Sequence, residues 1–143
     1  MKSTILTKQN VVSGIMAGLI AGLVFGFILA RMGVLSYAGR FLAMSDPLSA
    51  FITHMVFSGI LGVIFALVFF HGCTNFFNTT LWGIVYGIIW WFIGPMVLCP
   101  WMNGLPISWE SGQACNAIPM LFGHLVFGIT LGVSYFWMRN RKK

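Results

Sequence analysis

The chain has 143 residues, of which 59% are apolar and only 7% are charged, with a mean hydropathy of +0.92 and a formal net charge of +6. Soluble domains carry about 25% charged residues, so this composition excludes an ordinary soluble enzyme and predicts an integral membrane protein. Four long apolar runs occupy nearly the whole length. They predict a single four-span domain over residues 1–143, with no room for a separate soluble catalytic module.

The positive charge lies mainly at the two ends of the chain. Six of the eight cationic side chains are terminal: Lys2, Lys8, Arg139, Arg141, Lys142 and Lys143. Cationic flanks of membrane helices stay in the cytoplasm, so this pattern predicts that both termini are cytoplasmic. The same charges suit contact with anionic lipid headgroups. We therefore expect a lipid bilayer as the partner of these ends and no nucleic acid.

The first predicted span covers about residues 10–30 and carries a stripe of glycines. The glycines are four residues apart: Gly14, Gly18, Gly22 and Gly26. Such a stripe is typical of a helix face that packs closely against another helix. The neighbouring helix could belong to this chain, to another membrane subunit or to a second copy. In the outer loop that follows, residues 34–44 are expected to form a short amphipathic helix along the membrane interface.

The second predicted span covers about residues 48–70 and follows Asp46-Pro47. This pair is typical of a helix start, because Asp caps the first turn and Pro suits the first helical position. The third span covers about residues 80–98 and the fourth about residues 117–138. With short connections between them, these spans predict an all-α four-helix bundle.

Two cysteines flank the second outer loop, which covers residues 99–116. Cys99 and Cys115 could form a disulfide in an oxidising compartment. Cys73 lies in the inner connection between the second and third spans, where we expect it to stay reduced. Pairing cannot be deduced from the sequence alone, so the disulfide is an expectation.

A ten-residue segment of the second span recurs in the fourth span. Residues 54–63 and 124–133 are identical at six of the ten positions. Positions four apart on a helix form one ridge. Each copy has a histidine followed by small residues on that ridge: His54, Ser58 and Gly62 in the first copy, and His124, Gly128 and Gly132 in the second. Both imidazoles are therefore expected to face protein rather than lipid.

The first and third spans also resemble each other, since Gly14-Ile15 and Gly18 match Gly83-Ile84 and Gly87 at the same spacing. Two repeated helical hairpins of the same orientation are therefore predicted. Their natural symmetry is a pseudo-twofold axis along the membrane normal, which would bring the two histidines to one depth and toward each other.

Several roles are open to the paired histidines. A neutral imidazole can simply hydrogen-bond across a helix interface, which contributes on the order of 0.6 kcal/mol. Two imidazoles can also ligate a b-type haem or a transition metal such as zinc, copper or iron. A proton relay or contact with a quinone is a further alternative, because ionisable groups inside membranes mark functional sites.

The sequence lacks the parts of common catalytic sites. Its only acids are Asp46 and Glu110, which lie on different loops, so a mechanism with paired carboxylates has no candidates. No CxxC, HExxH, Walker or GxSxG pattern occurs. We therefore name no catalytic residues and expect a protein that is not an enzyme.

Three segments resemble a known family. Residues 53–58, residues 94–96 together with 104–106, and residues 122–126 are similar to segments of the small multi-pass bacterial inner-membrane proteins typified by YagU. The first outer loop is shorter here than in that family. The resemblance implies a multi-pass protein of a bacterial inner membrane, with no established biochemical activity and a loose association with acid tolerance. It also implies that the paired histidines are a feature of the family.

The sequence thus predicts a non-enzymatic inner-membrane protein, as an accessory or structural subunit of a membrane complex or as a self-associating protein, with a histidine pair near the outer face of the bundle. The alternative is a redox protein in which His54 and His124 bind haem or a metal. A third hypothesis is a pH-responsive protein, because the ordinary pKa of histidine is about 6.5.

Overall fold

The computed structural model describes residues 7–35 and 46–141, and every regular element in these ranges is a helix. The order of elements is α1 (Lys8–Arg31), α3 (Pro47–Val68), α4 (Phe76–Trp91), η1 (Phe92–Leu98), α5 (Cys99–Met102), α6 (Trp109–Ala114) and α7 (Ala117–Asn140). Four helices are long and apolar enough to cross a membrane: α1, α3, the continuous helix Phe76–Met102, and α7. For the described residues, the prediction of an all-helical fold with four helices of membrane-spanning length is confirmed. The amphipathic helix predicted over 34–44 falls almost entirely outside the described residues.

Side chains cap the starts of three of the long helices, α1, α3 and α4. The Asp46 carboxylate accepts a hydrogen bond from the Ser49 backbone N–H at 2.9 Å, and Pro47 occupies the first turn of α3, as Asp46-Pro47 predicted. The hydrogen bonds from Ser49 hold the pKa of Asp46 below its usual range. At α4, the Asn75 amide oxygen accepts from the Asn78 N–H at 2.8 Å. This cap explains why the third span begins at residue 76 rather than near residue 80.

The third span also continues past the predicted end, through a π-helical segment that contains Pro95. Proline has no backbone N–H, and its ring crowds the carbonyl group one turn earlier, so a regular α-helix cannot continue through it unchanged. Here the helix widens over Phe92–Leu98 and resumes as α5. Wide turns of this kind are often found at functional sites, and η1 lies beside the pocket described below.

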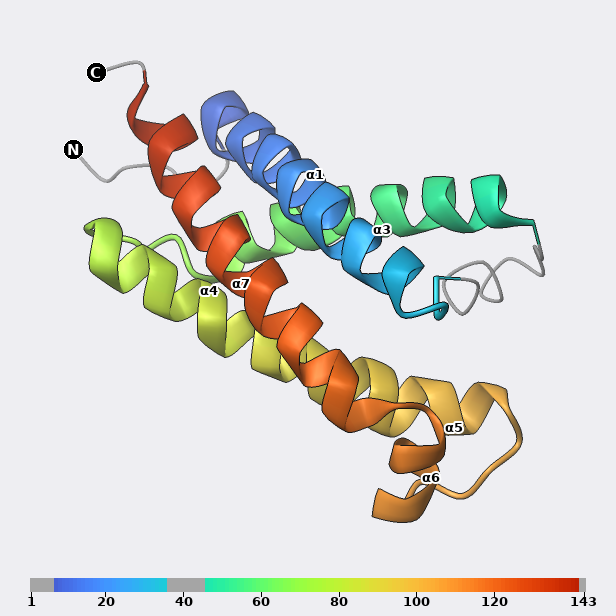
Figure 1. The fold of residues 1–143 in the computed structure, drawn as a ribbon. Helices are drawn as coiled ribbons and strands as arrows, with labels where there is room; N and C mark the ends of the chain where they lie inside the picture. The colour runs from blue at the N-terminus through green and yellow to red at the C-terminus, as the bar shows by residue number, and fades with distance from the viewer. Residues whose placement is uncertain (1–6, 36–45, 142–143) are drawn as a thin grey trace.

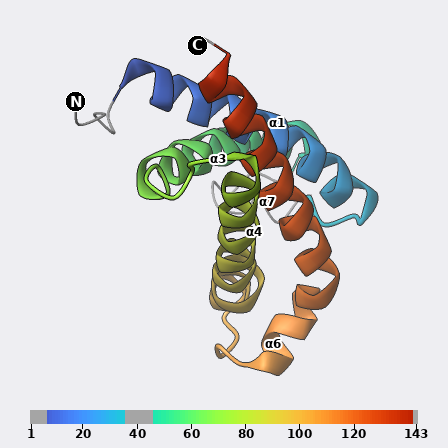
Figure 2. The ribbon, with the colours of Figure 1, turned by 90° about the vertical axis from the view of Figure 1, so that its left-hand side faces the viewer.

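The spanning helices form two hairpins, α1 with α3 and α4 with α7, and α1 also packs along α7 (Figure 1). The first turn of α1 and the last turn of α7 lie together, because the Gln9 side chain donates to the Arg139 carbonyl at 2.9 Å. We call this the terminal end of the bundle. The opposite end, which carries α6, is the loop end (Figure 2).

Closely packed glycines join α1 to α3. A Cβ atom added to Gly18 would collide with the Ser58 carbonyl oxygen and lie 2.9 Å from the Gly62 Cα atom. A Cβ atom on Gly14 would lie 2.6 Å from the Gly62 carbonyl oxygen, and one on Gly22 would collide with the Ser58 side chain. The glycine stripe of the first span is therefore covered by the small residues of α3 within the same chain.

The same kind of contact joins α4 to α7. A Cβ atom on Gly83 would collide with the Gly128 carbonyl oxygen and lie 3.1 Å from the Gly132 Cα atom. A Cβ atom on Gly87 would collide with the His124 carbonyl oxygen. Each hairpin is thus held by contact between backbones, which brings many atoms into van der Waals range. In a membrane this attraction matters because the hydrophobic effect does not drive helices together.

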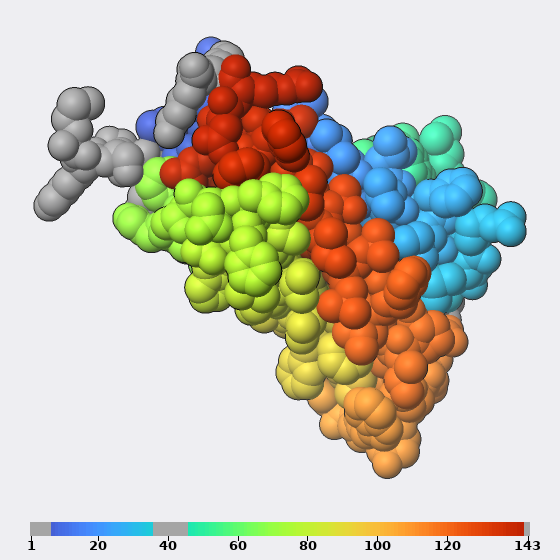
Figure 3. Space-filling model, turned by 60° about the vertical axis from the view of Figure 1, so that its left-hand side comes forward, coloured from blue at the N-terminus to red at the C-terminus, as the bar shows by residue number. Residues whose placement is uncertain are grey.

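The two hairpins meet mainly through α1 and α7, and α7 forms a diagonal band between α4 and α1 on one face (Figure 3). A buried aromatic cluster fills the terminal half, with Phe65 and Tyr135 both fully buried. The Tyr86 hydroxyl donates to the Leu61 carbonyl at 2.8 Å, so α4 reaches α3 there. Toward the loop end, α3 and α4 separate.

Replacement of Gly62 should weaken the first hairpin. In Gly62→Ala the new Cβ atom meets the backbone of Gly14 and lies 2.8 Å from the Gly18 Cα atom, so α1 and α3 must move apart. We expect a loss of about 1–3 kcal/mol of stability, as for other overpacked interiors. Unfolding by SDS titration in mixed micelles measures the change.

Gly59→Ala on the same helix is the control, because its Cβ atom would make an ordinary contact of 3.6 Å with the Leu19 side chain. It should leave stability unchanged or raise it slightly, since alanine is the better helix former. Equal losses in the two variants would contradict the close packing of Gly62.

Candidate functional site

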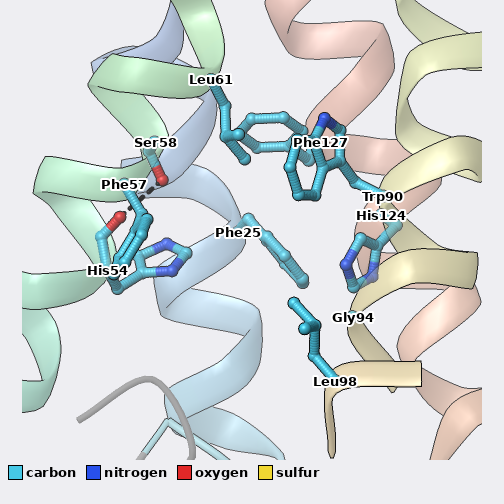
Figure 4. A pocket seen from close by; sticks show the side chains of 10 residues that line it. All are labelled: Phe25, His54, Phe57, Ser58, Leu61, Trp90, Gly94, Leu98, His124 and Phe127. Atoms are coloured by element: carbon cyan, nitrogen blue, oxygen red, sulfur yellow. Dashed lines mark hydrogen bonds between the residues drawn. The ribbon is translucent and has the colours of Figure 1, made fainter. Parts of the chain in front are cut away.

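A pocket of about 380 Å³ lies where α3 and α4 separate (Figure 4). It contains both histidines of the repeated segments and is otherwise mostly apolar. Its lining residues come from all four spanning helices: Phe25, His54, Phe57, Ser58, Leu61, Trp90, Gly94, Leu98, His124 and Phe127. The structure therefore brings the two predicted histidines to one cavity.

His54 is fixed by the first hairpin. Its Nε2 atom lies 2.8 Å from the Gly22 carbonyl oxygen, and its side chain is only 8% exposed. Because a carbonyl can only accept, Nε2 carries the proton and Nδ1 is the basic nitrogen. A Cβ atom on Gly26 would lie 3.1 Å from the imidazole, so this glycine makes room for the ring. The Ser58 hydroxyl donates to the His54 carbonyl at 2.8 Å.

His124 is held by its own helix. Its Nδ1 atom lies 2.8 Å from the Met120 carbonyl oxygen, one turn earlier in α7. Nδ1 therefore donates, and Nε2 is the nitrogen with the free lone pair. A Cβ atom on Gly94 would lie 3.8 Å from Nε2, so the missing side chain at this position of η1 leaves space beside it. His124 is half-buried and lines the pocket.

Phe25 separates the two imidazoles. Its ring centroid lies 5.6 Å from that of His54 and 4.7 Å from that of His124, and both contacts are edge-to-face. Figure 4 shows the phenyl ring between the two histidine rings. Gly123 of α7 packs directly on the ring, since a Cβ atom there would lie 2.9 Å from Phe25 Cδ2. The histidines share a pocket but do not face each other directly.

This arrangement does not suit an ion or a haem held by both histidines. Two imidazoles on one iron place their ligand nitrogens roughly 4 Å apart across the metal, and the Phe25 ring occupies that space. Within residues 7–35 and 46–141, no group of three His, Cys, Asp or Glu side chains could hold a metal ion. The geometry therefore does not favour the hypothesis of a haem or metal site between His54 and His124.

Sequence reasoning did not single out Phe25, although a signal for it exists. Phe25 follows Gly22 by three residues, and such positions share one face of a helix. An aromatic residue beside the glycine stripe must therefore lie near the hairpin interface, where Phe25 is only 7% exposed. The position of the ring relative to α7 depends on how the hairpins pack.

Comparison with known proteins adds no assignment. No family model, no curated protein and no solved structure matches this chain. The resemblance to the YagU-type proteins rests on the short segments named above and stays a prediction.

Cys99 and Cys115 are joined by a disulfide across the loop end, with their Cα atoms 6.2 Å apart. The bridge ties the end of the third span to the start of α7, where Asn116 adopts a left-handed conformation with φ of 58°. The Trp91 indole N–H donates to the Ala117 carbonyl at 2.5 Å. These links fix the first turns of α7, which carry His124 into the pocket.

Loss of the Phe25 ring should destabilise the bundle strongly. In Phe25→Ala the space between the imidazoles and Gly123 empties, and truncation of a buried phenylalanine typically costs about 3–5 kcal/mol. Phe27→Ala on the same helix is the control, because Phe27 is 69% exposed. It should change the unfolding midpoint little in SDS titration. Comparable losses in both variants would show that Phe25 does not fill the centre of the site.

Proposed function

We propose that this chain is a non-enzymatic integral protein of a bacterial inner membrane that binds a membrane-dissolved, uncharged molecule in the pocket between α3 and α4. One observation carries the proposal. The pocket is an apolar cavity lined by two imidazoles. One nitrogen of each ring hydrogen-bonds to a backbone carbonyl, and the other nitrogen has no hydrogen bond to a described residue.

The surroundings of the pocket support entry from the lipid. Phe57 lines the pocket and is 42% exposed, so the rim is apolar at the surface. Phe92 of η1, at 56% exposure, lies on the span that forms the other wall. In a membrane these faces contact acyl chains. A ligand of the pocket would thus arrive through the bilayer rather than from water.

The lining determines the chemistry of the ligand. Among the described residues, the pocket lining contains no Lys, Arg, Asp or Glu, so a net charge on the ligand would be desolvated without a counterion. The His124 Nε2 atom can accept one hydrogen bond, and Phe25, Trp90 and Phe127 offer aromatic surfaces. A flat ring with a hydroxyl group and an apolar tail, as in a quinol, has the matching features.

The orientation in the membrane is part of the same proposal, with both termini in the cytoplasm. The terminal cations support it. The disulfide at the loop end supports it independently, because disulfides persist in oxidising compartments outside the cytoplasm. The location in a bacterial inner membrane rests on the resemblance to the YagU-type proteins.

We also propose that the two hairpins are repeats of one unit. In each hairpin, glycines pack against small residues, and an imidazole lies beside a glycine of the other helix: His54 beside Gly26, and His124 beside Gly94. The glycine stripe of α1 no longer supports an accessory subunit or a self-associating chain, because α3 of the same chain covers it. Co-purification and measurement of oligomeric state would test such partners.

The pocket should bind a benzoquinol with a decyl tail. Titration of the protein in mild detergent should quench Trp90 fluorescence, because Trp90 lines the pocket. In Gly94→Leu the new side chain would occupy the space beside His124 Nε2, so binding of the quinol should be lost. His124→Ala should weaken binding roughly five-fold, since one hydrogen bond of about 1 kcal/mol is removed.

Ile89→Phe is the control for added bulk, because Ile89 lies on α4, is 42% exposed and does not line the pocket. Its affinity should match that of the unmodified chain. Trp90→Phe should remove the quenched component and identify its origin. Unchanged affinity in Gly94→Leu, or no quenching at all, would refute the pocket as the binding site.

Cys73 should report the orientation. It is the free cysteine of the chain and is 6% exposed. Burial raises the pKa of its thiol, opposed by a hydrogen bond with Thr79 and the charge of Arg139. A membrane-impermeant maleimide should label it only in inverted vesicles, and slowly near neutral pH.

Only the thiolate reacts with maleimide. In the unfolded chain the thiol pKa is about 8.5, so the labelling rate reaches its plateau above that pH. In the folded protein the labelling rate should still rise with pH where the rate for the unfolded chain is already constant. Cys99 and Cys115 should become reactive from the opposite face after an impermeant reductant is added. Fast labelling of Cys73 in right-side-out vesicles would reverse the proposed orientation.

A further inference from the structure

A second pocket, of about 320 Å³, lies at the terminal end of the bundle and differs in chemistry from the first. It is lined mainly by polar and charged groups from α7 and from the connection between α3 and α4. The lining residues are Phe70, His71, Cys73, Thr74, Thr79, Tyr135, Phe136, Arg139 and Asn140. The proposed function makes no use of this pocket.

Arg139 is held in a fixed position in this pocket. Its Nη1 atom donates to the carbonyl oxygens of Cys73 at 3.1 Å and Phe70 at 3.4 Å. The guanidinium carbon also lies 4.3 Å from the centroid of the Phe70 ring. These contacts orient the guanidinium, but both carbonyl oxygens accept hydrogen bonds from Nη1 alone. The donors on Nε and Nη2 make no hydrogen bond to a carbonyl or carboxylate within the described residues.

Within residues 7–35 and 46–141, no carboxylate side chain lies beside Arg139. The two acidic side chains of the sequence are Asp46 and Glu110. Asp46 caps the start of α3 and Glu110 lies in α6, so both belong to the loop end. A half-buried guanidinium with no carboxylate is costly, because burial removes solvation without an opposite charge in return. An anion from outside the chain would supply that charge.

Tyr135 adds an unused donor to the same pocket. The residue is fully buried, and its hydroxyl has no hydrogen-bond partner of ordinary geometry in the described part of the chain. Arg139 and Tyr135 line the same pocket. Buried polar groups without partners are rare, and each calls for a ligand or another explanation. His71, exposed at the rim, provides a further ring N–H.

We propose that this pocket binds an anionic phosphate group through Arg139 and Tyr135. The flat fork of donors on a guanidinium matches phosphate oxygens, and a hydroxyl can donate to a third. The terminal end carries the cations Lys8, Arg139 and Arg141, which face anionic headgroups if the termini are cytoplasmic. The phosphate can thus come from an anionic lipid headgroup or from phosphate in solution.

Binding of dioctanoyl phosphatidylglycerol to the full chain in neutral detergent, followed by native mass spectrometry, tests the proposal. Arg139→Gln should weaken binding roughly ten-fold or more, as expected for loss of charge-assisted hydrogen bonds. Tyr135→Phe should weaken it less, by roughly five-fold, because a neutral donor is lost. Arg139→Lys keeps the charge without the fork and should fall between the unmodified chain and Arg139→Gln.

Arg141→Gln is the matched control, because Arg141 lies exposed at the same end and does not line the pocket. It should bind as the unmodified chain does. Inorganic phosphate is the second probe. If it displaces the lipid at millimolar concentration, the site accepts free phosphate; if it does not, the site requires the headgroup, and either result supports the pocket.

If lipid binding were weakened equally in Arg139→Gln and Arg141→Gln, the proposal would be overturned. The lipid would then be attracted by the overall positive charge of the terminal end and not by the pocket. The absence of binding of both probes to the unmodified chain would overturn it as well. Dioctanoyl phosphatidylcholine should bind more weakly than the glycerol lipid, since its choline cation meets the cationic end of the bundle. Equal affinity for the two lipids would contradict selection of a headgroup with a net negative charge.

Discussion

Contact between backbones at glycines is the constraint on which the rest of this bundle depends. Gly14, Gly18 and Gly62 in the first hairpin, and Gly83 and Gly128 in the second, leave no space for a side-chain atom at the crossing. In a membrane the helices gain little from the hydrophobic effect when they associate, so dispersion at short range must hold them. Because these crossings determine where each hairpin helix lies, they also determine where its histidine lies.

Both hairpins are joined at a crossing of glycines, but their contacts with each other are not symmetric. With a twofold axis, the contact of α1 with α7 would be repeated by α4 with α3. Instead α1 and α7 lie along each other, whereas α3 and α4 meet mainly through side chains such as Tyr86 and Phe65 in the terminal half. The pocket occupies the space that a second long contact would have closed. Its existence is therefore a consequence of the unequal packing.

Much of this structure was predictable, and the rest was not for identifiable reasons. Long apolar runs predicted the four long helices, and Asp46-Pro47 predicted the start of α3. Helix spacing placed His54 and His124 on ridges of small residues, although it could not show Phe25 between them. Periodicity describes one helix at a time. The docking of two hairpins depends on how the side chains of both fit together, which the periodicity of a single helix does not show.

The π-helical segment at Pro95 has a consequence for the outer surface of the protein. Residues after such wide turns are rotated about the helix axis relative to an uninterrupted α-helix. The strip of the third span that faces lipid on the terminal side of η1 is therefore not the strip that faces lipid on its loop side. A bilayer around this helix meets a stepped surface rather than a straight one. Insertion or deletion of a single residue within Phe92–Leu98 would turn the disulfide-linked loop end, while the hairpin crossing at Gly83 and Gly87 kept its register.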